Sequence, residues 1–156
     1  MATVFDVGAF VLLQIGPATP TKLHKLIYYA QGHHLAWEGV PLFDEVLEAW
    51  ANGPVCHELW RGQPNFSILA HQDIPGDSTA LTGDQRGSII AVLDAYGHLD
   101  CHQLSVMTQA ERPWREARGS LPPGQRHNQP LDLSVMRQHF ADLIALDQVG
   151  DDSNDQ

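Results

Sequence analysis

The sequence predicts a mainly α-helical protein, a compact single-domain helical bundle around a central helix, with one small short-strand or extended element. Its 156 residues suit one domain with a full core. The segment 19–39 carries the start and stop signals of a helix and has apolar residues on more than one side. Further helix signals recur along the chain, separated by Gly and Pro. We expect a folded domain over residues 1–147 and an acidic, disordered tail over 148–156.

The predicted central helix has clear ends. Thr19 can cap it, Pro20 suits its first position, and Gly39 suits the left-handed residue after its end. Tyr28 and Leu35 lie away from the main apolar stripe, so we expect this helix to be packed on two sides near the middle of the domain. The stripe itself, at helical spacing, consists of Leu23, Leu26, Ile27, Ala30, His34 and Trp37. On this stripe, His34 is expected to be a core histidine that hydrogen-bonds the backbone.

The first half of the chain contains three further predicted elements. A helix over about 4–15 comes first and is broken by Gly16 and Pro17. Residues 44–50 lie between a proline and a Gly-Pro pair, which favours a short extended or single-turn segment. Pro54 then suits the first position of a helix over about 55–61.

The second half is predicted from capping residues. Turn residues make the chain over 63–80 irregular, and its apolar side chains form either a short edge strand or anchor the loop to the domain; they are Phe66, Ile68, Leu69 and Ile74. Thr82 and Gln85 have capping-box spacing, and the helix behind them stops at Gly97. Asp100 can cap a helix that ends before Pro113, and Asp132 can cap the last helix.

The charge balance disfavours several classes of function. Nine basic residues against nineteen acidic ones give a net charge of −10, with lysine only at positions 22 and 25. Nucleic-acid affinity comes largely from Lys and Arg, so direct nucleic-acid binding is not expected. An acidic surface favours encounter with a basic partner. Neither a membrane-spanning apolar run nor a basic residue before the first helix is present, so we expect a cytoplasmic protein.

Catalytic and metal-binding signals are weak. The pairs Cys56-His57 and Cys101-His102 supply zinc-ligand types, but neighbouring helical residues point about 100° apart and rarely face one ion. Cys56 lies at the start of the predicted helix over 55–61, where a helix N-terminus can lower the pKa of a thiol, but a small packed side chain is the favoured interpretation. Neither a nucleophile elbow nor a phosphate-binding glycine loop is present. We therefore assign no catalytic, metal or cofactor residues and keep a metal-dependent hydrolase as an alternative.

The four tryptophans are better candidates for function. Trp37 and Trp50 are expected in the core. Trp60 and Trp114 are candidates for a protein interface, because exposed Trp and Arg often anchor interfaces and both have arginine neighbours. These neighbours are Arg61, Arg112 and Arg115.

The chain contains an ordered series of short motifs: KLHKLIYYAQG from Lys22, Gly39, PLF from Pro41, EAW from Glu48, GPV from Gly53, AYG from Ala95, and ERPW from Glu111. This series resembles the Panacea domain, a family of antitoxins of toxin–antitoxin systems that are often phage-associated. The series spans nearly the whole chain and is specific as a series. Two departures concern the surface: Asn52 stands where an aromatic residue is common, and Gln109 where a histidine is common.

The resemblance implies a helical domain that performs no catalysis. It implies an antitoxin that binds and blocks a protein toxin encoded beside it, and the family's toxins include nucleotide-modifying enzymes related to alarmone synthetases. An acidic mimic of nucleic acid is a further alternative, disfavoured because the acidic residues are scattered. We expect partner binding by Lys25, Tyr29, Asn52, Trp60, Arg61, Arg112 and Trp114. We expect a scaffold role for Leu23, Leu26, Ile27, Tyr28, Ala30, Trp50, Gly53 and Pro54.

Overall fold

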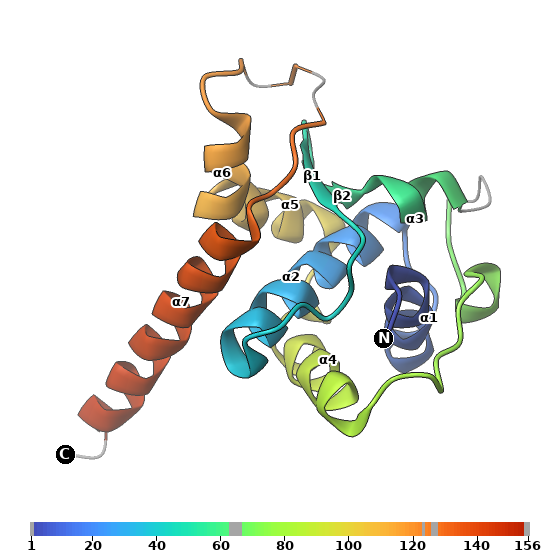
Figure 1. Cartoon of the computed structure of the whole chain (residues 1–156), viewed down its shortest axis with the longest axis horizontal. Coiled ribbons are helices and arrows are strands. Elements are labelled where there is room, and N and C mark those ends of the chain that lie inside the picture. The colour runs from blue at the N-terminus through green and yellow to red at the C-terminus, as the bar shows by residue number, and fades with distance from the viewer. Residues whose placement is uncertain (1, 63–66, 123, 126–127, 155–156) are drawn as a thin grey trace.

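The computed structural model describes residues 2–62, 67–122, 124–125 and 128–154 and shows one helical domain with a single small sheet in that part of the chain (Figure 1). This confirms the predicted fold class. No helix of the described ranges is long and apolar enough to cross a membrane. The elements are α1 (Val4–Ile15), α2 (Pro20–Glu38), β1 (Leu47–Trp50), β2 (Gly53–Cys56), α3 (His57–Gly62), the 3-10 turn η1 (His71–Asp73), α4 (Gly83–Tyr96), α5 (Cys101–Gln109), α6 (Arg112–Arg118) and α7 (Leu133–Asn154).

Helix α2 lies at the centre of the domain. The Thr19 hydroxyl accepts a hydrogen bond from the Lys22 N–H (3.2 Å), and Gly39 ends the helix in the left-handed region at φ 77°. Every residue from Leu23 to Leu35 is buried, because α1, α4, α5, α7 and β2 all contact this helix. The expected packing on more than one side is confirmed. In Figure 1, α7 and α1 lie on opposite sides of α2.

Two details of α2 differ from expectation. Trp37 is 43% exposed rather than in the core, because it lies in the last turn, beyond the buried part of the helix. His34 is buried as expected, but its Nδ1 pairs with the Ser88 hydroxyl (2.8 Å) on α4 rather than with the backbone.

The extended element is the β1–β2 hairpin. The strands are antiparallel, with Leu47 opposite Cys56 and Trp50 opposite Gly53, so a two-residue turn joins them. The expectation of an extended segment at 44–50 is confirmed over β1. The expected helix from residue 55 is wrong at its start, since helix α3 begins at His57 and Pro54 lies in β2.

Pro54 is tolerated in the strand because of its position in the ladder. It lies opposite Ala49, whose N–H points away from β2 and donates to the Gln129 carbonyl oxygen (2.8 Å). The Leu131 N–H donates to the Leu47 carbonyl oxygen (2.8 Å), so the chain before α7 covers the outer edge of β1. A proline there costs no hydrogen bond of the hairpin.

In the second half of the chain, helices α4, α5 and α7 begin directly after the predicted capping residues. Thr82 with Gln85 and Asp100 with Gln103 form reciprocal capping boxes, which confirms both predicted starts. Asp132 accepts from the Ser134 and Val135 N–H groups at the start of α7. Helix α7 continues to Asn154, past residue 147, where the sequence predicts the folded domain to end. At the other predicted strand, Leu69 pairs with Ala18 in an isolated bridge, and Phe66 lies outside the described residues.

Candidate partner-binding groove

A groove of about 820 Å³ lies where the hairpin turn meets the first turns of α2 and the helix α3. We call it the hairpin groove. Four segments build it: the first two turns of α2, the hairpin, helix α3, and the chain that covers β1 before α7. Its lining residues are Thr21, Lys25, Glu48, Trp50, Ala51, Asn52, Val55, His57, Trp60 and Asn128.

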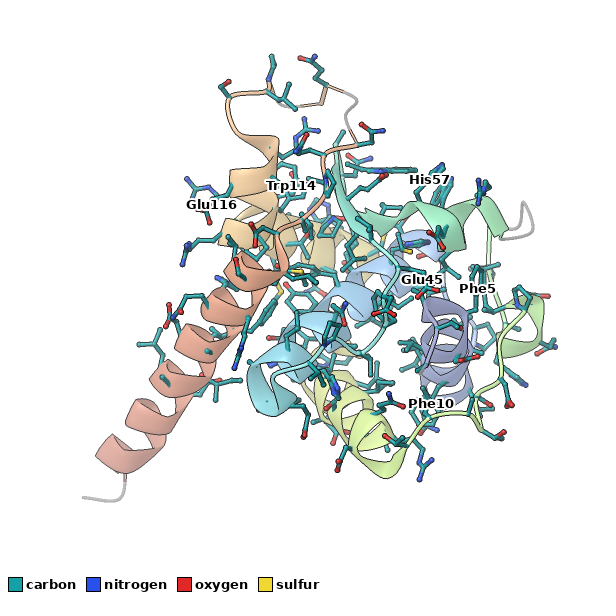
Figure 2. The ribbon with its side chains drawn as sticks, in the orientation of Figure 1. Phe5, Phe10, Glu45, His57, Trp114 and Glu116 are labelled. Carbon is teal, nitrogen blue, oxygen red and sulfur yellow. The ribbon has the colours of Figure 1, made fainter. Side chains whose placement is uncertain are left out.

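Aromatic side chains form one wall of the hairpin groove. The ring centroids of Trp50 and Trp60 are 5.6 Å apart at an interplanar angle of 62°, an edge-to-face arrangement. The Trp50 indole N–H donates to the Glu48 carboxylate (2.8 Å), which fixes that ring. Trp60 remains 42% exposed. His57, labelled in Figure 2 at the start of α3, lies with its ring centroid 6.2 Å from that of Trp50.

Lys25 lies at the floor of the hairpin groove and is only 1% exposed. Burial lowers the pKa of its amine to about 8, and the nearby Cys101 acts in the opposite direction. Gly53, at φ 125°, makes room for it: a Cβ there would lie 2.7 Å from the Lys25 Cε and 2.9 Å from the Thr108 hydroxyl. No described residue forms a hydrogen bond or ion pair with the Lys25 amine.

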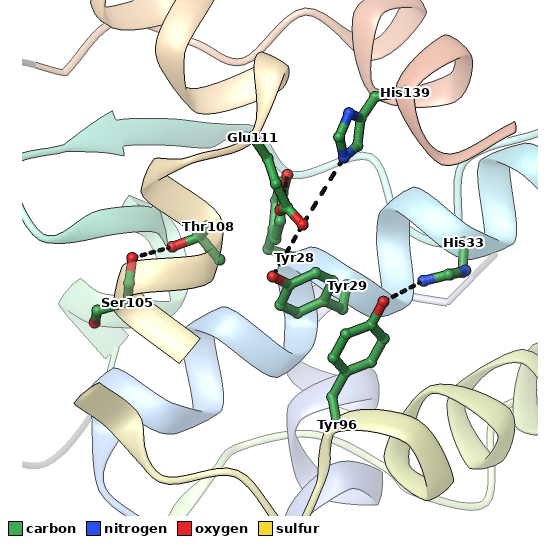
Figure 3. Close-up of polar contacts among 8 residues, drawn as sticks. All are labelled: Tyr28, Tyr29, His33, Tyr96, Ser105, Thr108, Glu111 and His139. Carbon is green, nitrogen blue, oxygen red and sulfur yellow. Dashed lines mark hydrogen bonds and ion pairs between the residues drawn. The ribbon is translucent and has the colours of Figure 1, made fainter. Parts of the chain in front are cut away.

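A second polar cluster lies inside the domain and serves the fold. The Glu111 carboxylate accepts hydrogen bonds from the hydroxyls of Tyr28 (2.9 Å) and Tyr29 (3.2 Å), as Figure 3 shows for part of the cluster. His139 on α7 lies 3.8 Å from the same carboxylate. Burial raises the pKa of both tyrosines, with Glu111 adding to the effect. This cluster ties α2, the start of α6 and α7 together.

Some of the expected partner-binding residues are exposed and others are buried. Asn52 and Trp60 are exposed in the hairpin groove, and Arg61 is exposed beside them on α3. Arg112 is exposed on α6 and pairs with Glu116 (3.1 Å). Two of the expected partner-binding residues are buried. Tyr29 is fully buried, because its ring stacks on Tyr96 and its hydroxyl donates to Glu111, whereas Lys25 is 1% exposed and lines the groove.

Trp114 connects α6 to the hairpin. Its indole N–H donates to the Trp50 carbonyl oxygen (2.8 Å), and the Arg118 guanidinium lies 5.4 Å from its ring centroid. The ring is half-buried, and Figure 2 shows it between α6 and the hairpin. Trp50, expected in the core, is half-buried as well. Trp114 therefore holds the hairpin in place and leaves less surface for a partner than expected.

The remaining scaffold residues are all buried. Gly53 and Pro54 are buried in β2. On α2 the fully buried scaffold side chains are Leu23, Leu26, Ile27, Tyr28 and Ala30.

Six residues that line the hairpin groove are in neither the expected partner-binding set nor the expected scaffold: Thr21, Glu48, Ala51, Val55, His57 and Asn128. Of these, Glu48 appears in the sequence only as part of a family motif, and His57 only as part of a candidate zinc pair. The chain before α7 carries no pattern that predicts its return to β1, so no local signal could have assigned Asn128 to this site.

The candidate zinc and nucleophile residues do not assemble into a site. Cys56 is buried, its N–H donates to His24 Nδ1 (3.1 Å), and burial raises the pKa of its thiol to about 11. A thiol with that pKa is not activated. Among the described residues, no three His, Cys, Asp or Glu side chains are grouped so that they could hold a metal ion.

Comparison with models of protein families finds one that matches this chain. The model of the SocA-like antitoxins with a Panacea domain matches residues 23–115, which is more than half of the chain. This chain belongs to the SocA-like Panacea antitoxin family. No curated protein and no solved structure gives a significant match. The Panacea match begins in the first turn of α2 and ends in α6, so it includes the hairpin, Lys25, Trp60 and Glu111.

His33, one of three buried histidines of α2, gives the Panacea domain a testable response to acid. Burial lowers the pKa of His33 to about 4; Asp147 acts in the opposite direction and His139 in the same one. The folded protein keeps His33 neutral, while the unfolded chain binds a proton below pH 6.5. Stability is therefore lost as the pH falls from 6.5 towards 4, and His33 accounts for about 2 kcal/mol of the loss between pH 7 and 5.

Urea unfolding of the wild type and of His33→Gln at pH 7 and pH 5 measures this loss in the free energy of unfolding. The exposed His98→Gln is the control and should keep the full loss; an unchanged loss in His33→Gln would contradict the assignment.

Proposed function

We propose that the chain is an antitoxin that neutralises a cognate protein toxin by direct, stoichiometric binding. The observation that carries this proposal is the Panacea family match over residues 23–115, which includes most of the hairpin groove's lining and its exposed tryptophan. Neutralisation requires no catalytic residue in the antitoxin. It requires a surface that binds the toxin tightly enough to cover its active site or the path of its substrate.

The hairpin groove and the neighbouring part of α3 supply such a surface. A stable interface buries about 1,600 Å² in total, and a few Trp, Tyr or Arg residues carry most of its binding energy. Trp60 and Arg61 are adjacent and exposed, and Asn52 lies at the exposed hairpin turn. We propose these three residues as the centre of the interface and Arg112 as a peripheral contact.

Charge indicates the kind of toxin. The chain carries a net charge of −10, and complementary charge speeds encounter and suppresses wrong partners. We propose a toxin with a basic substrate site, as in enzymes that modify nucleotides or tRNA and resemble alarmone synthetases. Such enzymes act on phosphate-rich substrates in the cytoplasm, where this antitoxin would also act.

Co-expression with the adjacent gene tests the proposal. The neighbouring product should arrest growth when expressed alone, and this protein should restore growth and copurify with it. If the neighbour is harmless alone, or remains toxic in the presence of this protein, the proposed function is wrong.

Substitution of Trp60 tests the proposed surface. We expect Trp60→Ala to weaken toxin binding by at least about thirtyfold, since a central interface tryptophan typically contributes 2 kcal/mol or more. Trp37→Ala is a matched control, because Trp37 is about as exposed as Trp60 but lies outside the groove. It is 12 residues further along α2 than Lys25, the last α2 residue that lines the groove, which corresponds to about 18 Å along the helix. Calorimetric titration measures both. Equal affinities for the two variants would contradict the placement of the interface.

A further inference from the structure

Among the residues that the structure describes, none is a hydrogen-bond or ion-pair partner of the Lys25 amine. The Lys25 side chain is 1% exposed, yet it contributes to the lining of an open groove. A buried charge is normally paired, because leaving water costs free energy that only a counter-charge and hydrogen bonds recover. No carboxylate of the described residues is paired with this amine. Below its pKa the amine therefore lacks an anion among the described residues, and the hairpin groove, which Lys25 lines, offers an open approach to it.

The groove also limits which anion fits. Its wall contains the Glu48 carboxylate, which already accepts from the Trp50 indole N–H. The whole chain is strongly acidic, with a net charge of −10. A multiply charged phosphate would be repelled by both, whereas a single carboxylate matches the single positive charge of Lys25.

The remaining groove residues suit a side chain that arrives from a protein surface. The indole rings of Trp50 and Trp60 offer apolar area to the methylene groups of an entering residue. Asn52 and Asn128 lie exposed in the lining, where their amide groups can bind the backbone of the segment that carries this residue.

We propose that Lys25 binds the carboxylate of an aspartate or glutamate side chain of the toxin, which enters the hairpin groove beside Trp50 and Trp60. This rests on the proposed antitoxin function and adds the specificity element of the interface. The general attraction between an acidic antitoxin and a basic toxin selects a class of partner. In the buried pair the charges are reversed: the antitoxin supplies the cation and the toxin the anion. This pair selects the individual toxin and fixes how the two proteins are aligned, because any toxin without the acid leaves Lys25 buried and unpaired.

Lys25→Met tests the proposal on the full-length chain. Methionine keeps a similar length without charge, so we expect the variant to unfold at a higher urea concentration than the wild type. We expect its affinity for the adjacent-gene toxin to fall by at least about thirtyfold. Gain of stability with loss of binding separates a recognition role from a purely structural one.

The only other lysine provides the matched control. Lys22→Met removes the same charge from a half-buried position one turn earlier on α2, and its affinity should stay within about threefold of the wild type. If wild type and both variants bind the toxin equally, the Lys25 site is wrong while the proposed function stands. If the wild type does not bind the toxin at all, the proposed function is wrong and this inference fails with it.

Two further measurements identify the anion. Each Asp and Glu on the toxin surface is changed to Asn or Gln, and one of these changes should weaken binding to the wild type but not weaken it further in Lys25→Met. The absence of any such coupled residue would overturn the proposal. Inorganic phosphate should compete no better than sodium chloride at equal ionic strength; selective competition by phosphate would assign the site to a phosphate group and overturn the carboxylate.

Discussion

Replacing Gly32 by alanine is expected to destabilise the protein by about 3 kcal/mol or more. A Cβ at this position would lie 2.1 Å from the Phe140 Cε2 atom, which is far inside van der Waals contact. The Phe140 ring has no room to turn away, because it is fully buried against the rings of Tyr28, Tyr29 and His33. Helices α2 and α7 would have to separate. Urea unfolding gives the change in free energy.

Gly87→Ala is the matched control for Gly32→Ala. Gly87 is also inside a helix, but it is exposed and a Cβ there would meet nothing within 4 Å. Removing an exposed helical glycine should stabilise the protein by about 0.5–1 kcal/mol. In a Phe140→Ala background the cost of Gly32→Ala should become small, because the clashing ring is gone. A Gly32→Ala protein as stable as the wild type would show that α2 and α7 do not pack as described.

Replacing Glu111 by alanine is the second large expected effect. It removes the acceptor of the buried Tyr28 and Tyr29 hydroxyls. An unsatisfied buried hydroxyl costs about 1–3 kcal/mol, so we expect a loss of roughly 3–5 kcal/mol in the free energy of unfolding. Glu111→Gln keeps a carbonyl acceptor and should cost clearly less than Glu111→Ala.

Glu116→Ala separates this effect from a simple loss of charge on α6. Its ion pair with Arg112 is about half exposed, and such pairs contribute about 0–1 kcal/mol. The same urea unfolding measurement applies to all three variants. If Glu111→Ala were no more destabilising than Glu116→Ala, the tyrosine cluster would not stabilise the fold as its geometry indicates.

The hairpin groove was only partly accessible to sequence reasoning. Trp60 and Asn52 could be found, because an exposed tryptophan beside an arginine and a turn before Gly53-Pro54 are local features. Glu48 and Asn128 are 80 residues apart in the chain and meet only because the segment before α7 returns to β1. A contact of that range leaves no periodic or capping signal in one sequence.

The sequence by itself determined most of the helices and those of their ends that carry a capping residue. The Thr19 and Asp100 caps, the Thr82 capping box and Gly39 satisfy or terminate backbone hydrogen bonds within four residues, so their effect is local and readable. It also determined that α2 is central, because apolar residues on more than one side of a helix require more than one neighbour.

Only the tertiary structure decided which polar residues of α2 are displayed. Periodicity shows which residues share a face, but it does not show how many faces other elements cover. Helices α1, α4, α5 and α7 and strand β2 surround α2 so completely that Lys25 and Tyr29 are buried, while Trp37 extends beyond them into solvent. Pro54 entered a strand instead of a helix because its position in the hairpin ladder needs no N–H.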